Sequence, residues 1–213
     1  MDQNSSELID DLRRAQSDNG FWGEILDSYR SRLRNMIHFQ MNHVLQGRVD
    51  PSDVIQESFV EATQRLPEFI ANPAVPFYVW LRSLAGQRLA QAHRYHLGTK
   101  ARDAGREVSI YSQPMPAASS AIIAAQLIGQ LTSPSSAAVE AEHKIRVQTA
   151  LAALDANDME ILVLRHFEEL SNAEAAAVLG LRPTAASNRY IRALERLRSI
   201  LSKGLDHPSE FSP

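Results

Sequence analysis

Residues 171–201 read SNAEAAAVLGLRPTAASNRYIRALERLRSIL, and this stretch predicts two helices joined by a tight turn. Ser171 and Glu174 have the spacing of a capping box, in which two side chains satisfy free backbone N–H groups at a helix start. Gly180 predicts the end of that helix, because glycine readily adopts the left-handed conformation that closes many helices. Pro183 predicts the start of the second helix, where its missing N–H is not needed. The pattern is typical of a helix-turn-helix.

The two predicted helices differ in composition. The first helix is rich in alanine, so the second helix can cross it closely, and the second helix carries several arginines. In DNA-binding helix-turn-helix proteins the N-terminal end of the second helix enters the major groove. Short side chains at that end are candidate base contacts: Thr184, Ala185, Ser187 and Asn188. The arginines are candidate phosphate contacts: Arg182, Arg189, Arg192 and Arg196. An ordinary helical hairpin is the simpler alternative, but it does not explain the whole combination.

The net charge of −3 hides two strongly basic stretches in the chain of 213 residues. Residues 82–106 and residues 180–203 each hold six Lys or Arg residues against one acid, a net charge of +5. A local positive field attracts phosphate whatever the total charge of the protein. Both stretches are therefore candidates for DNA contact, although a solvated helix face would explain either one alone.

Composition narrows the class of protein. The chain is 44% hydrophobic and 22% charged, as in ordinary globular proteins, and it has no cysteine, which excludes disulfides and thiolate metal sites. No apolar run approaches the roughly 18 residues of a membrane span, and the N-terminus lacks a signal-peptide core. We therefore expect a cytoplasmic protein without membrane insertion. No Gly-rich phosphate loop, nucleophile elbow or metal cluster occurs, so we predict no enzyme activity, cofactor or metal site.

An uncharged stretch divides the chain. Residues 108–139 contain no Asp, Glu, Lys or Arg and are rich in Ser, Ala and Pro, which predicts a linker. Its apolar part, residues 121–131, favours a short docked helix over free disorder. We predict an all-α fold of two small helical domains, residues 1–107 and 140–203, followed by a flexible tail over residues 204–213.

Apolar residues recur at spacings of three and four on both sides of the linker, which predicts helices. In the first domain we expect one helix over residues 21–45, one from Asp50 to a stop at Pro67, and one over residues 77–95. In the second domain Asp155 is expected to cap a helix that ends near residue 167. The last helix is expected to bury one apolar stripe: Ile191, Leu194, Leu197 and Leu201.

Residues 154–201 resemble the fourth conserved region of RNA polymerase sigma factors. The similarity is closest in DANDMEILVLRHFEELSNAEAAAVLG and in SNRYIRALERLR. The resemblance implies a domain that reads the −35 promoter element. Arg182 departs from the family, which usually has a capping residue before the recognition helix.

Two stretches of the first domain resemble the family's second conserved region. Residues 50–62, DPSDVIQESFVEA, are similar to its polymerase-binding helix, and residues 77–97 to its promoter-melting helix. The first similarity implies a core-facing Ile55 and Phe59 and an exposed polymerase-binding face of Asp53, Gln56 and Glu57. The second implies core packing for Trp80 and −10 element binding and melting by Arg82, Arg88, Arg94 and Tyr95. In the preceding loop, Asn72 is a candidate to hold a flipped base.

The absence of a middle domain places the chain, by resemblance, with the compact extracytoplasmic-function (ECF) group. This implies a transcription initiation factor whose partners are core RNA polymerase and promoter DNA, with an anti-sigma factor as a candidate third partner. The alternative is an autonomous helix-turn-helix regulator with an N-terminal dimerisation or sensing domain. Such a regulator should bind its duplex alone, and it leaves residues 50–62 and the basic helix after residue 77 without a role.

Overall fold

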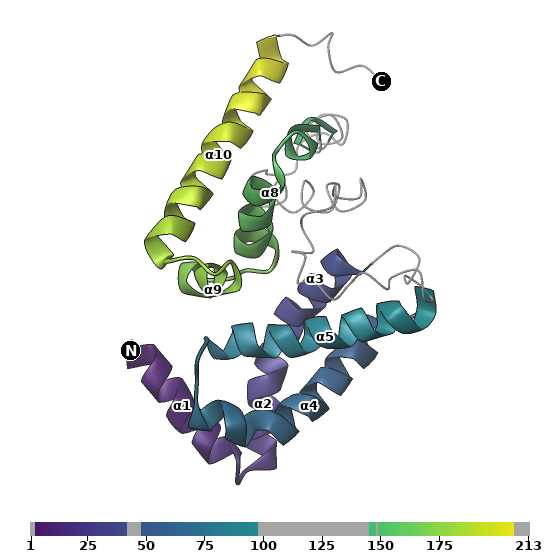
Figure 1. Cartoon of the computed structure of the whole chain (residues 1–213), viewed down its shortest axis with the longest axis vertical. Helices are drawn as coiled ribbons and strands as arrows, with labels where there is room; N and C mark the ends of the chain where they lie inside the picture. Colours follow the sequence, from purple (N-terminus) through teal and green to yellow (C-terminus); the bar gives the residue numbers. More distant parts are fainter. Residues whose placement is uncertain (1–2, 42–47, 98–144, 148, 207–213) are drawn as a thin grey trace, which may run out of the picture. The chain divides into compact units, whose positions relative to one another are not determined.

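The computed structural model describes residues 3–41, 48–97, 145–147 and 149–206, and these residues are helical with short connections and no strand. The chain divides into two compact units, Met1–Glu107 and Val108–Pro213 (Figure 1). The predicted linker, its apolar segment 121–131 and residues 207–213 lie outside the described residues. Within the described part, no helix combines the length and hydropathy needed to cross a membrane.

The described part of the N-terminal unit is a bundle of five helices (Figure 1). Helices α4 and α5 pack on one another, and α3 packs on both. The core at this junction includes Leu33 and Ile37 of α3, Ile55 of α4, and Leu81 and Leu84 of α5, all nearly inaccessible to solvent. The helices are α1 (Gln3–Ala15), α2 (Asn19–Ser28), α3 (Arg30–Gln40), α4 (Pro51–Ala71) and α5 (Phe77–Leu97).

The single helix predicted over residues 21–45 is wrong, because the chain forms two helices that meet at Tyr29. The Tyr29 N–H bonds the carbonyl of Leu26, three residues back, which closes α2 with a tightened turn. The Tyr29 ring then stacks on Tyr78 with 5.8 Å between ring centroids and meets Phe77 edge-on at 5.4 Å. Packing against α5 therefore decides a break that the local apolar pattern does not show.

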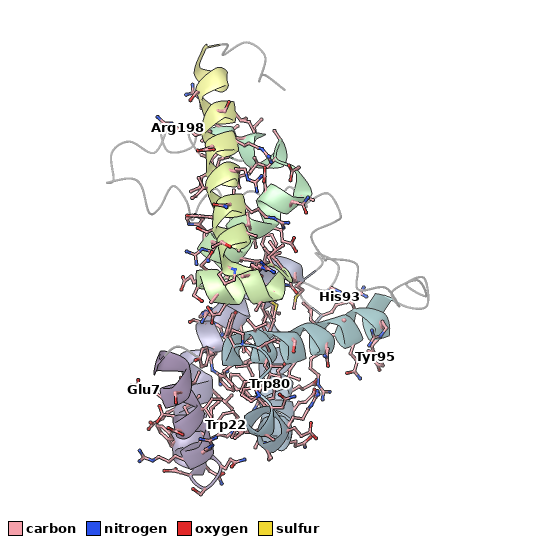
Figure 2. All side chains as sticks on the ribbon, turned by 60° about the vertical axis from the view of Figure 1, so that its left-hand side comes forward. Glu7, Trp22, Trp80, His93, Tyr95 and Arg198 are labelled. Atoms are coloured by element: carbon pink, nitrogen blue, oxygen red, sulfur yellow. The ribbon has the colours of Figure 1, made fainter. Side chains whose placement is uncertain are left out.

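Pro67 does not stop α4, contrary to the sequence-based prediction, since α4 continues to Ala71. A proline removes one helical hydrogen bond, so the last turn needs stabilisation from elsewhere. Phe69 supplies it: its ring is buried, stacks on Trp80 at 4.6 Å and meets Phe77 edge-on at 5.6 Å. Trp80, predicted to lie in the core, is half-buried, and Figure 2 shows its position with Trp22 in this unit.

The C-terminal unit forms the predicted helix-turn-helix. Ser171 and Glu174 make both hydrogen bonds of the capping box, and Gly180 has a φ of 63° in the left-handed region. The predicted cap at Asp155 is also confirmed, since its carboxylate accepts the N–H of Asp158. The labelled elements are α8 (Ala156–Leu162), the π-helical turn η3 (Val163–Phe167), α9 (Asn172–Val178) and α10 (Pro183–Asp206).

The predicted apolar stripe of α10 is wrong in two of its positions. Leu197 is buried, but Ile191 is 49% exposed and Leu194 is 36% exposed. The residues buried on this helix beside Leu197 are Ala186 and Ala193. Small side chains let α10 approach α8 and α9 closely, so the buried face is rotated toward the alanines and away from the larger residues.

Candidate nucleic-acid and polymerase-binding surfaces

The start of α10 is fixed by contacts from α9 and the turn. The Asn172 amide donates to the carbonyl of Pro183 at 2.8 Å, and the Leu181 N–H donates to the carbonyl of Ala176 at 2.9 Å. The Ala186 N–H bonds the carbonyl of Arg182, so α10 begins with its first turn intact. The N-terminal end of α10 is therefore held in one orientation by backbone and amide contacts.

The candidate base contacts lie at this end of α10. Thr184, Ala185 and Asn188 are exposed, whereas Ser187 is half-buried. Their small size leaves the helix end narrow enough for a major groove about 12 Å wide. The structure thus brings all four predicted residues onto the first two turns of one helix, with three of them open to solvent.

The candidate phosphate contacts separate into two groups. Arg182 and Arg192 are exposed and Arg189 is half-buried, and the Arg192 Nε donates to the carbonyl of Asn188 at 3.2 Å. Arg196 instead reaches α8, where its Nη1 lies 3.0 Å from Asp155 Oδ2 and also bonds Asp158 Oδ2. Arg182 and Arg192 are thus open to solvent and Arg189 partly so, whereas Arg196 is engaged within the unit.

A second polar contact joins α10 to the turn η3. The Tyr190 hydroxyl lies 2.9 Å from Nε2 of His166, and the Arg165 guanidinium carbon lies 5.4 Å from the centre of the Tyr190 ring. Burial lowers the pKa of His166, and the nearby Arg165 charge lowers that pKa further. In the neutral imidazole, Nε2 of His166 can either donate a hydrogen bond to the Tyr190 hydroxyl or accept one from it.

The predicted polymerase-binding helix has the expected two faces. Ile55 and Phe59 are buried, as predicted, whereas Asp53, Gln56 and Glu57 are exposed. Val60 lies one helical turn beyond Gln56 and is 57% exposed, so the polar face continues into an apolar position. The sequence reading missed Val60, although its spacing of four from Gln56 places both on one face.

The predicted −10 residues do not form one cluster. Asn72 is exposed and its N–H closes α4, whereas Arg94 and Tyr95 are exposed near the other end of α5. About 27 Å of helix separates Phe77 from Tyr95. Arg82 is half-buried, and Arg88 is half-buried against acids of α4. The six-turn helix α5 therefore offers separate contacts along its length.

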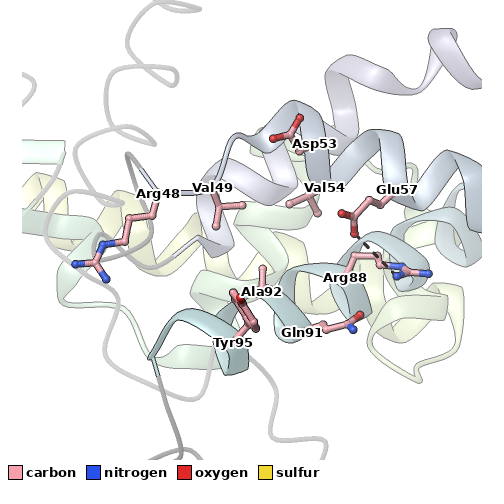
Figure 3. A pocket seen from close by; sticks show the side chains of 9 residues that line it. All are labelled: Arg48, Val49, Asp53, Val54, Glu57, Arg88, Gln91, Ala92 and Tyr95. Carbon is pink, nitrogen blue, oxygen red and sulfur yellow. Dashed lines mark ion pairs between the residues drawn. The ribbon is translucent and has the colours of Figure 1, made fainter.

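A hollow of about 330 Å³ lies between the start of α4 and the end of α5 (Figure 3). It brings residues of the predicted polymerase-binding set beside residues of the predicted −10 set. Glu57 and Arg88 point toward one another across it, with 3.9 Å between Oε2 and Nη1. Its lining is Arg48, Val49, Asp53, Val54, Glu57, Arg88, Gln91, Ala92 and Tyr95. No group of three or more potential metal-ligating residues occurs among the side chains that the structure describes.

Comparison with known proteins agrees with this architecture. Residues 144–197 match the family described as sigma-70, region 4. The ECF RNA polymerase sigma factor SigD of Mycobacterium tuberculosis is 28% identical over 184 residues, which cover 86% of this chain and 78% of SigD. The RNA polymerase sigma factor CnrH of Cupriavidus metallidurans is 28% identical over 152 residues, 71% of this chain and 73% of CnrH.

A solved structure of CnrH in complex with the cytosolic domain of CnrY covers 92% of this chain and 97% of that one, with 22% identity and a TM-score of 0.47. The match to sigma-70, region 4, falls on the unit that contains the helix-turn-helix. With the relatives that match along most of the chain, this match shows that the protein is similar to sigma factors of the ECF type.

Proposed function

We propose that this chain is a sigma factor of the ECF type, which binds core RNA polymerase through α4 and directs it to promoters by contacting two DNA elements. The single observation that carries the proposal is the exposed start of α10, held by the α9 turn and flanked by the solvent-directed Arg182 and Arg192. The relatives are named RNA polymerase sigma factors, which supports the same partner here. The protein supplies binding energy, and polymerase supplies the chemistry.

The C-terminal unit is proposed to read the −35 element. Thr184, Ala185, Ser187 and Asn188 would face base edges, while Arg182, Arg189 and Arg192 would position the helix on phosphates. Arg196 belongs to the same predicted set, but its two carboxylate partners on α8 compete with a phosphate for its guanidinium. The domain is proposed to span residues 140–203.

The docking face on α4 is proposed to consist of Asp53, Gln56 and Glu57. An acidic and amide-rich helix surface complements a basic partner helix, and complementary charge favours both the rate of encounter and the register. The buried Ile55 and Phe59 fix this face outward, since both side chains are anchored in the core.

The N-terminal domain, residues 1–107, is also proposed to read and melt the −10 element. Unpaired DNA requires cations for its phosphates and aromatic surfaces for its bases. Arg94 and the 82% exposed Tyr95 meet both needs at the end of α5, and Asn72 is proposed to hold a flipped base at the other end. Arg82 and Arg88 complete the proposed set, but Arg88 Nε bonds Glu61 Oε2 at 2.8 Å, so this carboxylate competes with a phosphate for its guanidinium.

The uncharged residues 108–139 are proposed to link the two domains, which lets them occupy separated elements together and raises effective affinity. We propose a cytoplasmic location, where core polymerase acts. An anti-sigma factor is a further partner to seek by co-purification, a proposal that rests on the family resemblance alone.

The test is co-elution of the full chain with bacterial core RNA polymerase on a sizing column, followed by competition with another sigma factor. We expect a stoichiometric complex from which the competitor displaces this chain. We also expect the complex to enrich, from a random-sequence pool, a duplex with two separated elements. A folded protein that forms no such complex, yet binds duplex DNA alone, would instead be an autonomous regulator.

A further inference from the structure

The recognition helix α10 is tied to α8 by one arginine. Arg196 Nη1 lies 3.0 Å from Asp155 Oδ2 and also bonds Asp158 Oδ2. The two acids differ in environment, because the side chain of Asp158 is 5% exposed and that of Asp155 is 55% exposed. Asp155 uses its other oxygen, Oδ1, to cap α8 through the Asp158 N–H at 2.9 Å. The cap of α8 and the attachment of α10 therefore share one carboxylate.

This arrangement opposes a phosphate contact by Arg196. A buried carboxylate without a cation is strongly unfavourable, and Arg196 is the cation that bonds Asp158 in the structure. Moving the guanidinium to a DNA phosphate would leave the Asp158 charge buried and uncompensated. Arg192, four residues earlier on the same helix, is exposed and donates only to a backbone carbonyl of its own helix among the contacts described.

A second attachment lies six residues nearer the DNA-reading end. Tyr190 meets His166 with 2.9 Å between the hydroxyl and Nε2, and Arg165 lies over the Tyr190 ring. Arg165 Nη1 also donates to the carbonyl of Leu170, directly before the cap of α9, at 2.6 Å. The π-helical turn η3 therefore contacts both the residue that precedes the cap of α9 and Tyr190 of α10, and such π turns are frequent at functional sites.

Two attachments about 9 Å apart along α10 restrain both its rotation and its tilt. The buried apolar residues of α10 are Ala186, Ala193 and Leu197, and the short side chains of the two alanines interlock little with neighbouring helices. We propose that Arg196 and Tyr190 are positioning residues, which set the angle at which α10 meets DNA, and that Arg196 makes no phosphate contact. This inference rests on the proposed function, in which α10 reads promoter DNA.

Asp158→Asn gives the sharpest test, because electrostatics and positioning predict opposite results. Removing a negative charge strengthens DNA binding if charge alone matters. If Asp158 holds Arg196 and thereby α10, the same change weakens binding. The probe is the complex of the full chain with core polymerase, measured against the duplex that the wild-type complex enriches from a random pool. We expect affinity to fall about fivefold, the loss of roughly one hydrogen bond. Equal or tighter binding overturns the proposal.

Salt dependence separates positioning from phosphate contact. Each phosphate contact contributes about 0.9 to the slope of log affinity against log salt concentration. Arg192→Gln, the matched control, is expected to flatten the slope by about that amount. Arg196→Gln is expected to weaken binding with the slope unchanged. A slope that flattens equally in both variants overturns the assignment of Arg196.

The second attachment provides variants that keep the fold. Tyr190→Phe removes one hydroxyl and leaves the ring under Arg165, and His166→Gln restores an amide group near the position of Nε2. We expect Tyr190→Phe and His166→Leu to weaken binding severalfold at unchanged salt slope, and His166→Gln to recover most of the affinity. Binding at the wild-type level in Tyr190→Phe overturns the role of Tyr190. If circular dichroism shows that Asp158→Asn has lost its helices, the Tyr190→Phe measurement decides the proposal in its place. A wild-type complex that enriches no duplex overturns the proposed function, and this inference with it.

Discussion

Arg88 of α5 donates from Nε to Oε2 of Glu61 on α4 across 2.8 Å. The two side chains are 32% and 16% exposed, and Glu57 approaches the same guanidinium at 3.9 Å. Part of the basic charge that was predicted to contact DNA therefore joins α5 to α4. Arg94, further along α5, is exposed.

Replacing Arg88 with Ala should lower the free energy of unfolding by about 1.5 kcal/mol, because the partly buried Glu61 loses one of its two arginine partners and keeps only Arg65, 3.1 Å from its Oε1. Arg94→Ala should change stability by no more than about 0.5 kcal/mol, as exposed substitutions do, while reducing promoter melting. Urea unfolding followed by the fluorescence of Trp22 and Trp80, both in this unit, measures the difference. Equal stability of the two variants would contradict the structural role of Arg88.

Replacement by alanine should have opposite effects on stability at Gly180 and Gly86. Gly180 has a φ of 63° and open space around its Cα, so Gly180→Ala costs only backbone strain, roughly 1–2 kcal/mol. Gly86 lies inside α5, and a Cβ there meets no atom within 4 Å, so Gly86→Ala should stabilise by about 0.5–1 kcal/mol. Thermal unfolding of both variants checks the pair. Gly180→Asn should cost less than Gly180→Ala, because asparagine tolerates the left-handed region.

The free energy of unfolding should decrease as the pH drops below neutral, because of His166. Burial and the Arg165 charge lower the pKa of the folded His166, so the unfolded chain takes up the proton first as pH falls. The contribution of His166 is therefore complete above about pH 6.5, the ordinary value, and is lost as pH falls toward the folded pKa. Burial also lowers the pKa of His93 in the other unit, with the same sign. Unfolding free energies at pH 7.5 and 5.5 should differ less in His166→Gln than in the parent.

Charge reversal at Asp53 should weaken binding to core polymerase by about tenfold without changing the fold, because this exposed carboxylate faces the proposed basic partner. Glu24→Lys is the matched control, an exposed acid on α2 outside the proposed face. Titration of labelled protein with core polymerase compares the two variants. Equal affinities would show that the docking face lies elsewhere.

Predictions that depend on local chemistry were the reliable ones. The capping box at Ser171, the cap at Asp155 and the left-handed Gly180 are each determined within a few residues. The buried Ile55 and Phe59 follow from their spacing on a single amphipathic helix. Errors arose where a distant helix competes with the local pattern, as at Tyr29 and Pro67.

The sequence by itself determined the helical class and the helix-turn-helix, because capping, glycine turns and apolar periodicity act over one or two helical turns. The resemblance to sigma factors likewise lies in the sequence, in residues 154–201, 50–62 and 77–97. Only the tertiary structure decided which cations are available to DNA. Arg88 and Arg196 resemble Arg94 and Arg192 in sequence, but each of the first two meets carboxylates on another helix, 27 residues away for Glu61 and 38 for Asp158. The charge of each arginine follows from the sequence, but the packing of the helices determines which carboxylate lies beside it.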